Sequence, residues 1–174
     1  MRRNKKLTLS AMFLALGMVL PFFTAQVKEI GDSLLPMHLP VMLCGLLCGP
    51  WYGMGVGLIL PILRGAVFSM PPLYPSGIWM ACELATYGLV IGGTYGRLKE
   101  PNTGKLYLCL VTAMLSGRIV WGIVKTLVLG LGGKAFSFQA FLVGGFLDAF
   151  PGIIIQLILI PVIMGVINRW KNRK

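Results

Sequence analysis

Long apolar runs separated by short polar segments dominate the chain. They cover about residues 7–25, 35–49, 78–95, 106–131 and 141–167, and a further run extends from the GPWYG motif to about residue 70. A helix needs about 20 residues to cross a bilayer. The pattern predicts an all-α polytopic membrane protein, a six-helix transmembrane bundle. Residues 1–174 would form this single domain, with no room for a soluble one.

Proline and glycine divide these runs. The second run is short, with Pro36 and Pro40 near its start, and GPWYG predicts a tight turn after it. MPPLYPSG predicts a stiff connection before the fourth run. Pro151 and Pro161 are expected to break the sixth.

The composition supports a membrane protein. Charged residues make up 12% and hydrophobic residues 56%, whereas soluble domains have about 25% charged residues. The net charge of +11 is concentrated at the chain ends, which favours topology signals and anionic-lipid contacts over nucleic-acid binding. The basic, apolar N-terminus has no clear cleavage site and is interpreted as a retained first helix.

Loop charges predict the orientation. With both termini inside, eleven of the sixteen Lys and Arg lie on the inner side and two, Lys28 and Lys134, on the outer side. The positive-inside rule therefore predicts a multi-pass protein with both termini in the cytoplasm.

The four cysteines all fall within apolar runs. Cys44 and Cys48 are one helical turn apart, but no further Cys or His has ligand spacing, so packing is favoured over a metal pair. We expect no metal site and no cofactor.

Five charged residues interrupt the predicted helices: Arg64, Glu83, Arg118, Lys125 and Asp148. Each costs about 2.5–3.5 kcal/mol at a helix centre, so each needs a partner, water or a ligand. In the predicted topology these residues and His38 gather in the outer half of the membrane, with Arg118 nearest the middle.

Helical spacing sorts the candidate residues into three faces. These are Arg118, Trp121 and Lys125; Trp79, Glu83 and Tyr87; and Gly145, Asp148, Gly152 and Gln156. Aromatic rings beside charges suit a pocket for a small polar molecule. Three cations against two anions favour an anionic or zwitterionic solute.

The same residues also permit a purely structural interpretation. In it, Arg64 or Arg118 would pair with Glu83 or Asp148 simply to hold helices together, and His38 would cap a helix or lie at the membrane interface. Catalysis is not indicated, because no Ser-His-Asp set, HExxH or paired carboxylates appear. No Walker A motif appears either, so another subunit would have to hydrolyse ATP.

The motif Ala11-x-x-x-Ala15, the short segment PMHLPVMLCGLLCGPWYG, six predicted crossings and basic termini occur together. With these features the whole chain resembles the substrate-binding S components of energy-coupling factor (ECF) vitamin transporters. The resemblance implies a bacterial plasma membrane protein that binds a vitamin or related micronutrient from outside. It also implies docking through Ala11 and Ala15 onto a membrane scaffold subunit carried by two ATPases.

The resemblance is closest to a branch associated with pantothenate, whose carboxylate suits surplus Arg and Lys. Riboflavin, pyridoxine-like and cobalamin-type ligands remain open, because Trp and Tyr stack on rings. The alternative function is a self-sufficient secondary transporter of a small anionic solute, with Glu83 or Asp148 carrying protons. The absence of an evident inverted repeat weakens it.

Overall fold

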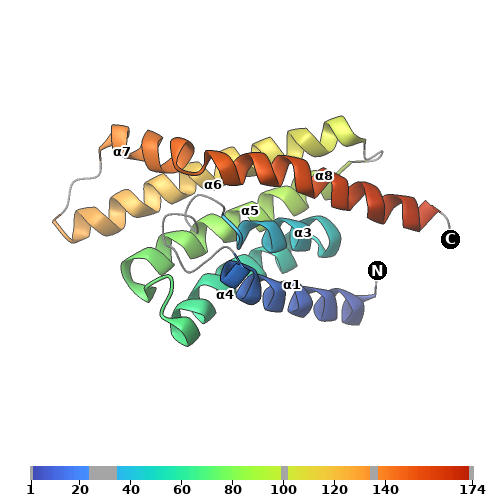
Figure 1. Cartoon of the computed structure of the whole chain (residues 1–174), viewed down its shortest axis with the longest axis horizontal. Coiled ribbons are helices and arrows are strands. Elements are labelled where there is room, and N and C mark those ends of the chain that lie inside the picture. The colour runs from blue at the N-terminus through green and yellow to red at the C-terminus, as the bar shows by residue number, and fades with distance from the viewer. Residues whose placement is uncertain (1, 24–34, 99–101, 134–136, 173–174) are drawn as a thin grey trace.

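The computed structural model describes residues 2–23, 35–98, 102–133 and 137–172, and every regular element among them is helical. Figure 1 shows the arrangement. The elements are α1 (Arg3–Phe23), α3 (His38–Cys48), α4 (Pro50–Phe68), η1 (Leu73–Gly77), α5 (Ile78–Gly96), α6 (Thr103–Leu131), α7 (Phe138–Leu142), η2 (Val143–Leu147) and α8 (Phe150–Asn172). The described part of the chain is therefore all-α, as the apolar runs predict.

Among the described residues, four helices are long and apolar enough to cross a membrane: Arg3–Phe22, Pro50–Phe68, Thr103–Leu131 and Phe150–Arg169. The apolar helices His38–Cys48 and Phe138–Leu147 are shorter. α5 has 19 residues, including Glu83, and is not among the four. The chain therefore has the helices of a membrane protein, and six crossings stay a prediction.

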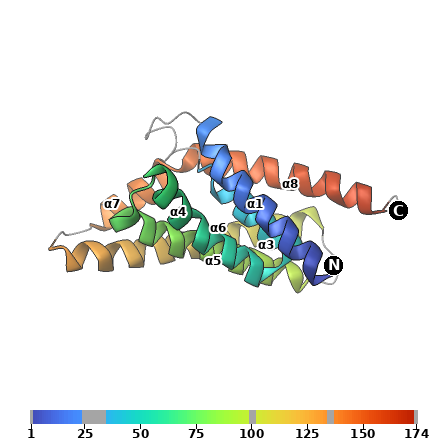
Figure 2. The same cartoon turned by 90° about the horizontal axis from the view of Figure 1, so that it is seen from below.

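Four helix ends that lie at or next to basic residues are found at one end of the molecule. The start of α1, the end of α5, the start of α6 and the end of α8 lie together in Figures 1 and 2. Which side of the membrane this end of the molecule faces stays a prediction. Lys28, Lys99, Lys134, Arg173 and Lys174, which also entered that prediction, lie outside the described residues.

Glycines allow α3, α4 and α5 to pack backbone against backbone. A Cβ atom on Gly45 of α3 would lie 2.6 Å from the carbonyl oxygen of Gly88 on α5, and one on Gly53 of α4 would lie 2.8 Å from the same oxygen. Small residues let membrane helices approach this closely. The crossing places His38, at the start of α3, beside α5.

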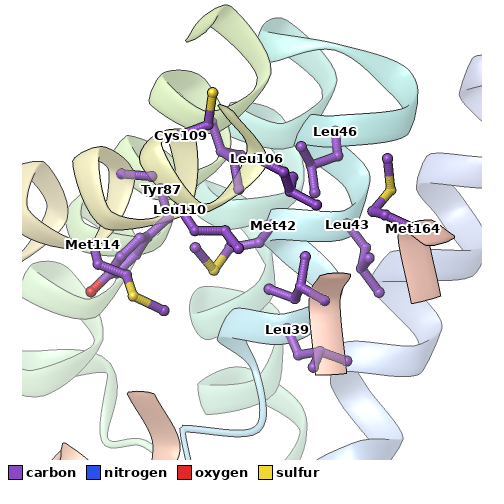
Figure 3. Packing of buried hydrophobic residues seen from close by; sticks show 13 residues of the cluster. Leu39, Met42, Leu43, Leu46, Tyr87, Leu106, Cys109, Leu110, Met114 and Met164 are labelled. Carbon is purple, nitrogen blue, oxygen red and sulfur yellow. The ribbon is translucent and has the colours of Figure 1, made fainter. Parts of the chain in front are cut away.

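Apolar side chains fill the space on both sides of α3. One cluster joins α3 to α5, α6 and α8, and Figure 3 shows Met42, Leu110 and Met114 packing around Tyr87 in it. A second cluster, which includes Cys44 and Cys48, joins α3 to α4 and α5. Burial of these side chains stabilises the bundle that positions the polar residues.

The tight turn predicted at GPWYG is confirmed, and the break predicted at Pro161 is wrong. α3 and α4 are joined by Gly49 alone, with φ of +104°, and the remainder of GPWYG forms the first turn of α4. Pro161 lies inside α8; the interruption comes at residues 148–149, just before Pro151. Proline is tolerated in the first turn of a helix, where its missing N–H has no partner to lose. Inside a membrane helix neighbouring groups satisfy the freed carbonyl.

Candidate functional site

The predicted faces of α5 and α6 pack against each other. Glu83 of α5 meets Arg118 of α6, with 2.9 Å between Oε1 and Nη1. One turn along α5, the ring of Tyr87 lies against Gly117, where a Cβ would come within 2.8 Å of Cε2. This seam between α5 and α6 brings the two predicted sets of polar and aromatic residues together.

A buried carboxylate joins three helices. His38 Nε2 of α3 lies 3.5 Å from Glu83 Oε1, on the carboxylate that also pairs with Arg118. Exposed fractions are 1% for His38, 2% for Glu83 and 4% for Arg118. The His38 ring packs edge-on against Tyr87, with 5.0 Å between centroids. An opposite charge at this distance offsets much of the cost of burying Glu83.

Several buried side-chain nitrogen atoms of α3, α6 and α8 have no hydrogen-bond partner among the described residues. They are Nε and Nη2 of Arg118, both ring nitrogens of His38, and Nε2 of Gln156. Buried polar groups in folded proteins are nearly always hydrogen-bonded. The N–H groups of Arg118 in the seam can therefore donate to an oxygen of water or of a solute.

An aromatic and cationic layer adjoins the ion pair. Lys125 Nζ lies 4.3 Å from the ring centroid of Trp121 and 5.5 Å from that of Trp79. The Arg118 guanidinium lies 5.9 Å from the Trp121 ring. Trp121 is buried, whereas Trp79 and Lys125 are half-buried. An ammonium group held over indole rings gains cation–π energy.

Asp148 lies near this layer, but not in the position that helical spacing predicts. Gly145, Gly152 and Gln156 are buried as expected, but Asp148 is exposed. The π-helical turn η2 and the interruption at residues 148–149 change the helical register, so Asp148 leaves the predicted line. A Cβ on Gly144 would lie 3.4 Å from Cη2 of Trp121 and 3.9 Å from Oδ2 of Asp148.

Arg64 makes its contacts elsewhere. Its Nη1 donates a hydrogen bond of 2.7 Å to the carbonyl oxygen of Met18 in α1. Its guanidinium lies 5.0 Å from the centroid of Phe22 and 5.5 Å from that of Phe68. Arg64 thus joins the ends of α1 and α4, and its contacts in the structure are not shared with Glu83.

Ala11 and Ala15 lie on an exposed face of α1. Met12, Leu16 and Val19 on the same helix are 62%, 42% and 49% exposed. The opposite side of α1 packs inward through Ser10 and Gly17. The Ala-x-x-x-Ala face is therefore accessible in the single chain.

Phe141 of α7 is a neighbour of the site that the sequence reasoning missed. Its ring centroid lies 6.0 Å from that of Trp121, and its edge occupies the space above Gly122. The signal in the sequence was a glycine on α6 next to a tryptophan, where a large ring from another segment can fit.

The sequence was compared with models of known protein families, and one family model matches nearly the whole chain. The model of the family described as "ECF transporter, substrate-specific component" matches residues 5–164. The chain belongs to this family.

Comparisons of the S component with curated proteins and with solved structures found no match. Membership covers nearly the whole chain and makes the protein a membrane transport subunit that confers substrate specificity. It also implies a small-molecule substrate and partnership with an ECF module. The seam between α5 and α6 is the cluster of buried polar and aromatic residues from which a substrate site can be built.

Proposed function

We propose that this S component binds an anionic micronutrient against Trp79, Trp121 and Lys125. The observation that carries the proposal is the position of Lys125 Nζ, 4.3 Å and 5.5 Å from two indole rings on facing helices. The ammonium group recognises a carboxylate, and the rings accept the apolar or planar part of the solute. Asp148 borders the same region, whereas Tyr87 lies two turns along α5 from Trp79, against Gly117.

The buried ion pair supports this assignment of roles. Arg118 is engaged by Glu83, so its main task is to hold α5 and α6 in register. Its remaining N–H groups, the side-chain amide of Gln156 and the single N–H of a neutral His38 ring donate to oxygen atoms of the solute. Arg64 serves the α1–α4 contact and is not part of this site.

Pantothenate is the leading candidate, because it combines one carboxylate with hydroxyl and amide groups. Riboflavin, a pyridoxine-like compound and a cobalamin-type ligand are the next candidates. In the proposed assembly the S component crosses the bacterial plasma membrane six times with cytoplasmic termini. It docks through Ala11 and Ala15 onto a scaffold subunit with two ATPases, which supply the energy.

Binding is tested with the purified protein in nanodiscs and two matched probes, pantothenate and its alcohol, pantothenol. Pantothenate is expected to raise the melting temperature and pantothenol to have little effect, because the alcohol lacks the carboxylate. Lys125→Met should remove the pantothenate effect, and Lys105→Met, at the far end of α6, should keep it. Equal binding of both probes, or full binding by Lys125→Met, would contradict the proposal.

Docking is tested separately by uptake in cells that also produce an ECF module. Ala11→Phe and Ala15→Phe should abolish uptake while the purified variants still bind solute. Leu108→Phe is the control, because Leu108 is 68% exposed on a different helix. Loss of solute binding in folded Ala11→Phe would count against a docking role.

A second function, proton-coupled transport without partners, is favoured by one observation: the buried titratable pair His38 and Glu83. Liposomes that contain only this protein and a proton gradient test it. Accumulation of solute that stops when a protonophore collapses the gradient would establish this alternative, whereas accumulation only with the ATPases would exclude it.

A further inference from the structure

A groove of about 530 Å³ lies between α6 and α7, on a different face of α6 from the seam. Its lining residues are Ile119, Gly122, Ile123, Thr126, Leu127, Ser137, Phe138 and Phe141. On α6 these residues recur at intervals of three and four, so they form one continuous face of the helix. The groove is therefore separate from the layer formed by Trp79, Trp121 and Lys125.

The lining offers little to a polar molecule. Its two hydroxyl groups are already engaged: Thr126 donates to the carbonyl oxygen of Gly122 at 2.7 Å. Ser137 accepts from the backbone N–H of Ala140 at 3.1 Å, which caps α7. The remaining lining is aliphatic, aromatic or glycine, so an occupant must be apolar along its length.

The position of the groove identifies that occupant. Ile119, Ile123 and Leu127 are 56%, 54% and 61% exposed, and Phe138 is 73% exposed. Because α6 is long and apolar enough to cross a bilayer, an exposed apolar strip along it would face the hydrocarbon, and the groove would open toward it. We infer that the groove holds one acyl chain of a membrane phospholipid.

An acyl chain here would act on the solute site through Phe141. Phe141 lines the groove. Its ring centroid also lies 6.0 Å from that of Trp121, and the ring packs against Gly122. A filled groove holds Phe141 against the wall of the site, and an empty groove leaves it room to move. This consequence, unlike occupancy itself, rests on the proposed function.

Occupancy is tested by native mass spectrometry of the full chain released from mild detergent. The wild-type protein should retain one phospholipid, and Ile123→Trp should lose it because the indole fills the groove. Leu115→Trp should retain it, since Leu115 is 48% exposed on the same helix but outside the lining. Equal retention by Ile123→Trp, confirmed as folded by circular dichroism, would overturn the inference.

A second measurement needs no variant and covers the case in which Ile123→Trp fails to fold. The wild-type protein is reconstituted with phosphatidylcholine that carries a diazirine in one acyl chain, then irradiated and digested. Labels should concentrate in peptides that contain residues 119–127 and 137–141. Labelling spread evenly over all exposed apolar residues would contradict a specific site. Loss of these labels only after assembly with an ECF module would assign the groove to a partner helix instead.

The link to the solute is measured with pantothenate as the probe. Removal of lipid should weaken pantothenate binding, and addition of phosphatidylcholine should restore it. Displacement of the lipid by pantothenate would instead make the groove part of the solute site and overturn the inference. If pantothenate does not bind even with lipid present, the proposed function fails, while the mass-spectrometric and labelling results still decide occupancy.

Discussion

Oε1 of Glu83 and Nη1 of Arg118 lie 2.9 Å apart, and both side chains are almost fully buried. Removal of one partner leaves the other charge buried without compensation, at a cost of about 3–5 kcal/mol. We therefore expect Glu83→Gln and Arg118→Met each to lower stability strongly. The double variant should lose less than the sum of the two single changes.

The measurement is unfolding in mixed detergent micelles, read as a double-mutant cycle. Because His38 contacts the same carboxylate, His38→Gln is measured as a third single variant. We expect it to lose less stability than Glu83→Gln or Arg118→Met. Strictly additive losses would show that the two side chains do not interact in the folded protein.

Gly92→Ala and Gly93→Ala form a matched pair of neighbouring changes on α5. A Cβ on Gly92 would lie 2.6 Å from the backbone nitrogen of Pro50 and 2.7 Å from the carbonyl oxygen of Gly45, whereas one on Gly93 meets nothing within 4 Å. Forced separation of packed helices costs about 1–3 kcal/mol. Gly92→Ala should lower the melting temperature and Gly93→Ala should preserve or raise it, as measured by thermal denaturation. The opposite order would argue against the close crossing of α3, α4 and α5.

Trp121→Leu tests the aromatic wall of the proposed site. Loss of one ring beside a cation and a solute should weaken pantothenate binding about 3- to 30-fold, the equivalent of a single cation–π contact. The control is Trp51→Leu, because Trp51 is 71% exposed on α4. Titration calorimetry checks both; equal affinity of the two variants would remove Trp121 from the site.

Arg64→Met separates a structural arginine from a solute-binding one. The change removes a charge-assisted hydrogen bond to Met18 and two aromatic contacts. We expect a loss of about 1.5–3 kcal/mol in stability with unchanged pantothenate affinity. Arg64→Lys should restore part of the stability, since lysine keeps the charge but lacks the planar fork. A variant with normal stability and lost affinity would return Arg64 to the solute site.

Much of the candidate site follows from helical periodicity. The spacing of Trp79, Glu83 and Tyr87 places them on one face of α5, and that of Arg118 and Lys125 does the same on α6. In the structure these two faces meet. Asp148 did not follow, because it lies in the interruption between η2 and α8, and Phe141 did not, because it lies on α7 before the π-helical turn.

The sequence by itself determined the all-helical membrane character of the chain and the composition of each helix face, since both depend on local hydrophobicity and a period of 3.6 residues. Only the tertiary structure decided which charge meets which. Arg118 pairs with Glu83, while Arg64, equally buried, binds a carbonyl of α1. That choice depends on where the helices cross, and the crossing is set by backbone contacts between glycines as far apart as Gly45 and Gly88. No local pattern records such a contact, because its two halves belong to different helices.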